Sequence, residues 1–271
     1  MSRARRAARP LGAAARLASG RAASGGGAVL CYHDVVGTRD ELSDPLDVTI
    51  DQVRTHVRVT RRLGFRFVPL AELGARVVRG EAVDGLVAVA FDDALAGVAR
   101  HALPVLVEQE VPASLMTVAT GWGERPAWWP GSGRTMTRSE LVEAVGLGFD
   151  IAAHTRTHTS LAGLGPARLR DEVAGCRAEL EDLTASRLTQ FAYPFGHHDP
   201  AAREAVADAG FDAAWTFLNG RVCPGDDRYR LPRLTMGSHH GATRLAYHLG
   251  RSAGSWPDHQ QDRVAGTPEA L

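Results

Sequence analysis

Short apolar segments that end on polar residues alternate along this chain with longer segments whose apolar residues recur every three or four positions. Apolar runs of strand length that are rich in Val are typical of strands buried on both faces, whereas the longer periodic segments are typical of helices. Strands are predicted at 28–33, 65–70, 87–92, 113–118, 149–153, 190–193 and 213–217, with a short eighth strand or its remnant at 230–233. Helices are predicted at 50–63, 71–79, 101–110, 137–146, 166–183, 200–209 and 241–249. This alternation predicts parallel βαβ units, hence an α/β barrel or a doubly wound sheet.

The third strand runs directly into two adjacent carboxylates, Asp92 and Asp93. Open α/β sheets and α/β barrels carry their chemistry at the carboxyl ends of their strands. Because successive residues of a strand point to opposite sides, the two aspartates need not share one role. One is expected to bind a ligand while the other acts as a base.

The amino-acid composition excludes some classes of protein but identifies no further functional site. The chain has 271 residues and a formal net charge of zero, which fits one domain of about 200–250 residues and gives no indication of nucleic-acid binding. All its basic residues other than histidine are Arg, so the Arg count is not taken as a phosphate-binding signal. Cys31, Cys176 and Cys223 are too few and too scattered for a disulfide framework or a cysteine-based zinc site. No segment approaches the roughly 18 apolar residues of a membrane span.

The two ends of the chain differ from the middle. Residues 1–27 carry six arginines and no acidic residue and are predicted to be a disordered basic tail; 28–250 form the folded domain, and 251–271 are a loose C-terminal tail. The apolar core of about 7–15 residues that a secretory signal requires is missing, which favours a cytoplasmic location. A targeting peptide or a wrongly chosen start codon is an alternative. The basic tail could also make weak contact with anionic lipid head groups.

A second signal is the pair His154 and His158. Histidines four residues apart on a helical turn point the same way and can bind one metal ion together. His154 follows the strand at 149–153, so it is expected on the same rim as Asp93. Two imidazoles and one carboxylate are the protein ligands of a catalytic zinc, which lowers the pKa of a bound water to about 7. Asp92 would then be the base for that water.

At this point the chain resembles the polysaccharide deacetylases, the NodB-like carbohydrate esterases, over roughly residues 28 to 235. Four motifs of that family are matched in order, by Phe91-Asp92-Asp93, His154 to His158, Phe191-Ala-Tyr-Pro-Phe-Gly196 and Asp212-Ala-Ala-Trp215. Tyr32-His33-Asp34 and Leu231-Pro232-Arg233 recur in a branch of the family. The resemblance implies a distorted (β/α) barrel of about seven parallel strands. It also implies hydrolysis of the N-acetyl group of an N-acetylated amino sugar or glycan, with release of acetate.

The resemblance also implies roles for individual residues. Asp92 would be the base. A divalent metal, most often zinc, would be held by Asp93, His154 and His158. The substrate groove would be walled by Tyr193, Pro194, Phe195 and Gly196, with the Phe195 N–H stabilising the oxyanion, and Trp215 would form part of the acetyl pocket.

The departures from the family pattern concern the surroundings of Asp92 and Asp93. The family usually has Thr and Gly around its Phe-Asp-Asp motif, where this chain has Ala90 and Ala94, and Ala94 suits the position if its φ is negative. The third motif often carries an Arg that pairs with the catalytic Asp, and position 192 is Ala. We hypothesise that Arg233 supplies this cation from another strand end.

The family's late histidine motif for the general acid is also absent. Candidates for this acid are His33, His239, His240 and His197. His33 is the first choice because it ends the first strand on the presumed active rim.

Two alternatives stay open. The same metal site could act on a non-sugar amide or an O-acetyl ester, or the chain could be a glycan-binding descendant without activity; the intact Asp92 favours an enzyme. Residues 119–135 form a long loop with Trp122, Trp128 and Trp129. These rings could stack on sugars or simply pack beneath the loop.

Overall fold

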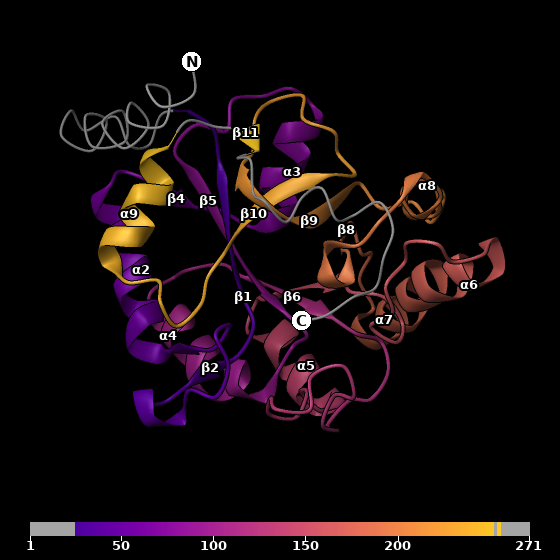
Figure 1. The fold of residues 1–271 in the computed structure, drawn as a ribbon, viewed down its shortest axis with the longest axis horizontal. Coiled ribbons are helices and arrows are strands. Elements are labelled where there is room, and N and C mark those ends of the chain that lie inside the picture. The colour runs from indigo at the N-terminus through magenta and orange to yellow at the C-terminus, as the bar shows by residue number, and fades with distance from the viewer. Residues whose placement is uncertain (1–24, 252–253, 256–271) are drawn as a thin grey trace, which may run out of the picture.

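The computed structural model describes residues 25–251 and 254–255, and its centre is a closed barrel (Figure 1). Seven parallel strands pair in the order β1-β10-β9-β8-β7-β6-β5, and β5 pairs with β1 to close the ring. Their bounds are β1 (Ala28–Tyr32), β5 (Leu86–Asp92), β6 (Ser114–Thr117), β7 (Asp150–Ala153), β8 (Gln190–Ala192), β9 (Ala213–Arg221) and β10 (Leu231–Thr235). The prediction of a distorted (β/α) barrel with about seven parallel strands is confirmed.

Four short strands lie outside the ring. β4 (Arg66–Phe67) pairs with the start of β5, and β2 (Val35–Val36) pairs with β3 (Val48–Thr49) beside the barrel. β11 (Gly254–Ser255) runs antiparallel to the end of β9. The segment predicted at 230–233 is therefore a full member of the barrel, whereas the strand predicted at 65–70 is reduced to two residues.

Helices surround the strands in the order that the apolar periodicity predicts (Figure 1). α2 and α5 each begin with a capping box, in which Thr49 pairs with Gln52 and Thr137 with Glu140. The predicted helix at 166–183 contains a π-helical turn, η3, between two α-helical parts, and the one at 101–110 begins as a π-helical turn, η2. The bounds are α2 (Ile50–Arg62), α3 (Leu70–Val78), η2 (Val98–Ala102), α4 (Leu103–Glu108), α5 (Arg138–Gly146), α6 (Pro166–Arg170), η3 (Asp171–Gly175), α7 (Cys176–Thr184), α8 (Pro200–Asp208) and α9 (Ala242–Gly250); η1 (Arg39–Glu41) and η4 (Pro194–Gly196) are single 3-10 turns.

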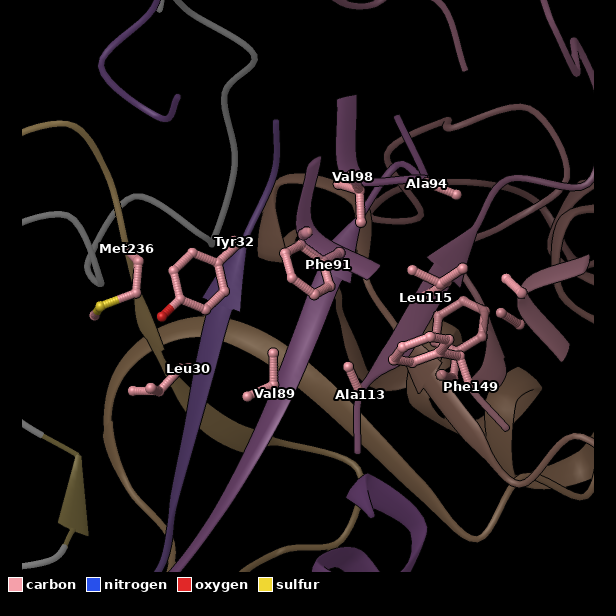
Figure 2. Close-up of a cluster of buried hydrophobic side chains, with 14 of the residues drawn as sticks. Leu30, Tyr32, Val89, Phe91, Ala94, Val98, Ala113, Leu115, Phe149 and Met236 are labelled. Atoms are coloured by element: carbon pink, nitrogen blue, oxygen red, sulfur yellow. The ribbon is translucent and has the colours of Figure 1, made fainter. Parts of the chain in front are cut away.

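Strand alternation divides the core into two clusters. The outer cluster lies between strands and helices and includes Val87, Val89 and Phe91 of β5; Figure 2 shows part of it. The inner cluster includes the intervening Ala88 and Ala90 and fills the barrel. Each buried Val or Phe contributes about 1.5–3 kcal/mol to stability, so a shift of one residue in register would be costly. The same alternation directs Asp92, the next residue of the inward series, into the barrel.

The amino end of the barrel is closed by α3. Gly74 of this helix lies against Gln190 and Ala213, the first residues of β8 and β9, where a Cβ would come within 2.8 Å of the Gln190 side chain. Leu70, Leu73 and Val77 of α3 belong to the inner cluster. The carboxyl end of the strands, where other α/β barrels carry their sites, is not covered by α3.

Most of the two predicted tails lies outside the described residues. At the N-terminal boundary, the N–H groups of Gly25 and Gly26 donate to Asp84, and Gly27 bridges to Val222. At the C-terminal side, Gly254–Ser255 is paired with β9. Over the described residues, none of the helices combines the length and apolar character that crossing a bilayer requires.

Candidate active site

Three side chains from two strand ends converge on one point at the carboxyl rim. Asp93 Oδ1 lies 3.0 Å from Nε2 of His158 and 3.7 Å from Nε2 of His154. His154 donates from Nδ1 to the carbonyl oxygen of Ala192 at 2.8 Å, which leaves its Nε2 free of the proton. Burial lowers the pKa of His154 to about 4, so its ring is neutral at pH 7. Neutral imidazole is the form that binds metal ions.

The three residues fit a divalent cation. One ligand atom from each of Asp93, His154 and His158 lies within 4.8 Å of the others, and all three side chains are buried. Although His158 is close, Asp93 Oδ1 makes no hydrogen bond to any described residue. A buried carboxylate oxygen without a hydrogen bond is costly unless a cation or another charge compensates it. Two imidazole nitrogens and one carboxylate oxygen are a donor set that zinc accepts.

The backbone that carries these ligands differs from the prediction. His154 and His158 do not lie on a helical turn: the segment between them is an irregular loop, in which Thr155 has φ 62° and His158 has φ 57°. The condition of a negative φ, under which alanine would suit position 94, is not met: Ala94 has φ 48°, and Asp93 before it has φ 66°. Left-handed conformations cost a non-glycine residue about 1–2 kcal/mol each and concentrate at functional sites. The spacing of the histidines suited a metal, but a strained loop rather than a helix brings them together.

Asp92 points into the barrel and meets Arg233 of β10. The guanidinium donates from its two terminal nitrogens to Oδ1 and Oδ2 of Asp92 at 2.6 and 2.9 Å, and from Nε to the Thr216 carbonyl at 2.9 Å. Both side chains are about 1% exposed. Burial alone would raise the pKa of Asp92, but Arg233, with smaller contributions from His154 and His33, outweighs burial and holds it below its usual range.

The pairing that the Arg233 hypothesis requires is therefore present. Ala192, where the family often has an Arg, belongs to the inner cluster. An Arg at position 192 or at position 233 would thus enter the same interior from different strands.

Among the histidines considered as general acids, His33 lies beside Asp92. Its Nε2 is 3.9 Å from Asp92 Oδ2, and its ring makes edge contacts with Trp129 and Phe217. His240 instead accepts from the N–H of Gly237 and packs against His239 and His248. His197 lies 3.2 Å from Ser160 Oγ and tilts against Phe195.

The third motif contributes one side chain to the site. Phe195, with φ 58° and 39% of its surface exposed, packs its ring edge-on against His158 at a centroid distance of 4.8 Å. Tyr193 is fully buried and points to the outer cluster, where its hydroxyl donates to the Tyr229 carbonyl. Pro194 and Gly196 flank Phe195 in the turn η4, and both are buried.

Trp215 is not brought to the rim. It is fully buried in the inner cluster, and its Nε1 donates to Gln190 Oε1 at 2.9 Å. Phe217, two residues further along β9 on the same face, contacts both His33 and the Arg233 guanidinium. The position two residues along a strand is the signal that would have found Phe217 from the sequence.

The three tryptophans of the 119–135 loop differ in their surroundings: one packs beneath the loop, and two contact histidines of the site. Trp122 packs on the outer cluster and donates from Nε1 to the Val118 carbonyl. Trp128 stacks on the ring of His158, with centroids 4.5 Å apart and planes 16° apart. Trp129 contacts His33 edge-on. Sequence spacing gave no signal for these two contacts, because the loop folds back over the rim from outside the barrel strands.

At its carboxyl rim the barrel carries a carboxylate and two histidines that fit a cation, and beside them an aspartate paired with an arginine. This combination of fold and site is typical of a hydrolase. The family model described as polysaccharide deacetylase matches residues 79–214, which is half of the chain. The chain belongs to the polysaccharide deacetylase family. Members of the family act on acetylated glycans. Membership therefore indicates that the chain is an enzyme that hydrolyses acetyl amides.

Three individual proteins illustrate this similarity. A putative polysaccharide deacetylase of Bacillus subtilis (strain 168), YxkH, is 21% identical over 207 residues, which cover 76% of this chain and 70% of YxkH. The structure of IcaB from Ammonifex degensii is 25% identical with a TM-score of 0.72, covering 84% of this chain and 98% of IcaB. The deacetylase PplD of Streptococcus pyogenes, solved with acetate, shares the fold at 18% identity and a TM-score of 0.71, covering 82% and 97%.

Proposed function

We propose that this protein is a metal-dependent N-deacetylase that removes the acetyl group from an N-acetylated amino sugar or glycan and releases acetate. The observation that carries the proposal is the convergence of Asp93, His154 and His158 beside Asp92, which Arg233 holds in place. A cation site alone would suit a binding protein. A second carboxylate with its own arginine, next to that site, suits hydrolysis.

Asp93, His154 and His158 would hold the metal, for which Zn²⁺ is the first choice because of the mixed nitrogen and oxygen donors. When bound, a divalent metal of this kind polarises a carbonyl oxygen and acidifies water. The donation from His154 Nδ1 to the Ala192 carbonyl keeps the opposite nitrogen available as a ligand.

Asp92 is the base that accepts a proton from the attacking water. Arg233 keeps this carboxylate ionised and fixes its orientation through two hydrogen bonds. The attack places negative charge on the acetyl oxygen, where the Phe195 N–H would donate a stabilising hydrogen bond.

His33 would donate the proton that the departing nitrogen needs, since an unprotonated amine is a poor leaving group. Its Nε2 is 3.9 Å from Asp92, so the base and the acid flank one volume at the rim. Trp128, Trp129, Phe195 and Phe217 border that volume through their contacts with His158 and His33. Aromatic faces of this kind suit the apolar face of a pyranose ring.

The test is an assay of acetate release from N-acetylhexosamine oligomers, with an O-acetyl ester and a non-sugar acetamide in the same panel, before and after chelation. Chelation should abolish acetate release, and Zn²⁺ should restore it. Asp92→Asn should lower turnover by about 100-fold or more while metal content, measured by mass spectrometry, stays unchanged.

Three outcomes contradict the proposal in different ways. Release only from the ester or the non-sugar amide would move the substrate class while keeping the metal site. Full activity after complete chelation would remove the metal. Glycan binding without release of acetate by the metal-loaded protein would make the chain a binding module.

A further inference from the structure

A buried glutamate outside the site is tied to the loop that carries the two histidines. Glu172 lies in the π-helical turn η3 and is 0% exposed. Its Oε2 accepts from the backbone N–H of Thr157 at 2.9 Å, and its Oε1 accepts from the Thr157 hydroxyl at 2.6 Å. Arg168, one helical turn earlier, forms an ion pair with Oε1 at 2.9 Å, and the Glu172 carbonyl accepts from the Arg156 N–H at 3.0 Å. Both backbone N–H groups just before His158 are therefore bound to one residue.

The loop needs such anchors because its backbone is strained. Thr155 is β-branched, yet it has φ 62°, and its buried Oγ1 makes no hydrogen bond to any described residue. His158 has φ 57°. Conformations of this kind persist only where the surrounding structure determines them. The carbonyl groups of the same loop have other partners: Thr120 Oγ1 donates to the Arg156 carbonyl, and the Ala119 N–H donates to the Thr155 carbonyl.

The Arg156 side chain provides a comparison within the same loop. Its guanidinium forms ion pairs with Glu179 and Asp171, whose side chains are 36% and 41% exposed. Exposed ion pairs contribute at most about 1 kcal/mol, whereas a buried carboxylate that accepts several charge-assisted or short hydrogen bonds constrains geometry strongly. Glu172, rather than the ion pairs of Arg156, is thus the contact that defines where Thr157 lies.

We propose that Glu172 is a positioning residue that preorganises the loop from His154 to His158 for the cation, by holding Thr157 through both oxygens of its carboxylate. The inference rests on the proposed metal-dependent function and concerns the affinity for the ion. π-Helical turns within α-helices commonly occur at functional sites, and η3 places a glutamate there that touches no reacting group. Removing a residue that orients a metal ligand typically costs 10- to 100-fold in metal affinity.

The experiment measures the apparent Kd for Zn²⁺ by competition with a chromophoric chelator, and the visible spectrum of the Co²⁺-loaded protein. Glu172→Gln keeps the size of the side chain but removes its charge and replaces one acceptor oxygen with an amide donor, so the side chain can no longer accept from both the N–H and the hydroxyl of Thr157. We expect a Kd about 10- to 100-fold higher than that of the wild type and an altered Co²⁺ spectrum. Glu179→Gln, on the same helix and also in contact with the loop, is the matched control and should change the Kd by less than about twofold.

Thr157 supplies a second, independent arm in case Glu172→Gln does not fold. Thr157→Val removes the hydroxyl, which contacts Glu172 Oε1 and also Thr159 Oγ1 at 2.8 Å, and should weaken Zn²⁺ binding in the same direction. Thr157→Ser keeps both contacts and should bind as the wild type does. Wild-type Zn²⁺ affinity in Glu172→Gln, or in Thr157→Val, would overturn the inference while leaving the proposed function intact. A wild-type protein that binds no Zn²⁺ would instead overturn the proposed function itself.

Discussion

Asp92 and Arg233 form the contact on which the chemistry of single residues depends. Both are about 1% exposed, and two hydrogen bonds join them. Removing one partner of a buried ion pair leaves the other charge uncompensated, at a cost of about 3–5 kcal/mol. The pair is therefore sensitive to any change of length or charge at position 233.

Arg233→Ala should lower kcat by about 100-fold, because Asp92 loses both its orientation and the charge that keeps it ionised. Metal content should stay at the wild-type level, since Asp93 and the two histidines are unchanged. The measurement is acetate release together with metal analysis. Arg230→Ala, three residues earlier and exposed, is the control. Unchanged turnover in Arg233→Ala would show that Asp92 works without this cation.

The same residues show what the sequence could reveal about the site. Asp92 and Asp93 are recognisable because a predicted strand runs into them, His154 because it follows the next predicted strand end but one, and His158 because it lies four residues after His154. Arg233 could only be hypothesised, since an arginine near a late strand has no spacing relation to Asp92. Their contact depends on β1 pairing with both β5 and β10, which is a property of the closed barrel.

Among the elements, the turn η4 packs against strand β9 and carries Phe195, which contacts His158 at the rim. Gly196 has φ 72°, and a Cβ at this position would lie 2.7 Å from the Phe217 Cβ and 2.8 Å from the Phe217 backbone nitrogen. The backbone of β9 cannot move without disturbing the sheet. η4 therefore keeps Phe195 against His158 only while position 196 has no side chain.

Gly196→Ala should lower both stability and kcat/KM. The left-handed φ alone costs alanine about 1–2 kcal/mol, and the contact with β9 adds to this cost. Gly163→Ala separates the two causes, because Gly163 has φ 79° but open space around it. Thermal unfolding and acetate release of both variants check the prediction. Equal losses of stability in the two variants, with kcat/KM unaffected in Gly196→Ala, would contradict it.

The elements also show where periodicity misled. A four-residue spacing predicts a helical turn, but His154 and His158 lie on a loop whose geometry is imposed by neighbours such as Glu172. Two left-handed residues cannot be inferred from a spacing that a helix would satisfy equally well. Helices with local caps, such as α2 and α5, were predictable because Thr49 and Thr137 carry their own partners three residues on.

At the scale of the whole molecule, three histidines outside the site form a cluster, His56, His240 and His248. This cluster connects helices α2 and α9 with the loop that precedes α9. His56 accepts from the Tyr32 hydroxyl and donates to the His240 carbonyl, and His240 packs against His248. Burial lowers the pKa of all three, to about 3 for His240 and about 4 for His248, where neighbouring positive charge adds to the effect. The folded protein therefore keeps these rings neutral where the unfolded chain protonates them.

Stability should fall as pH decreases from about 6.5 towards 4. In this window these three histidines bind more protons in the unfolded state than in the folded state, so their contribution to the free energy of unfolding rises with pH and is lost on acidification. Urea unfolding of the chelator-treated protein at pH 7, 6, 5 and 4 measures the slope. His240→Asn keeps an acceptor for the Gly237 N–H without a titrating ring and should flatten it. An unfolding free energy independent of pH over this range in the wild type would contradict the assignment.

By itself, the sequence determined the order of strands and helices, the α/β class and the carboxylates and imidazoles available for chemistry, because periodicity, caps and strand-end residues are local properties. Family motifs added the barrel. Only the tertiary structure decided which cation pairs with Asp92, that Phe217 rather than Trp215 borders the site, and that Trp128 covers His158. Each of these contacts joins segments that are distant in sequence. Closing the barrel sets the first two distances and the path of the 119–135 loop over the rim sets the third, so no local preference determines any of them.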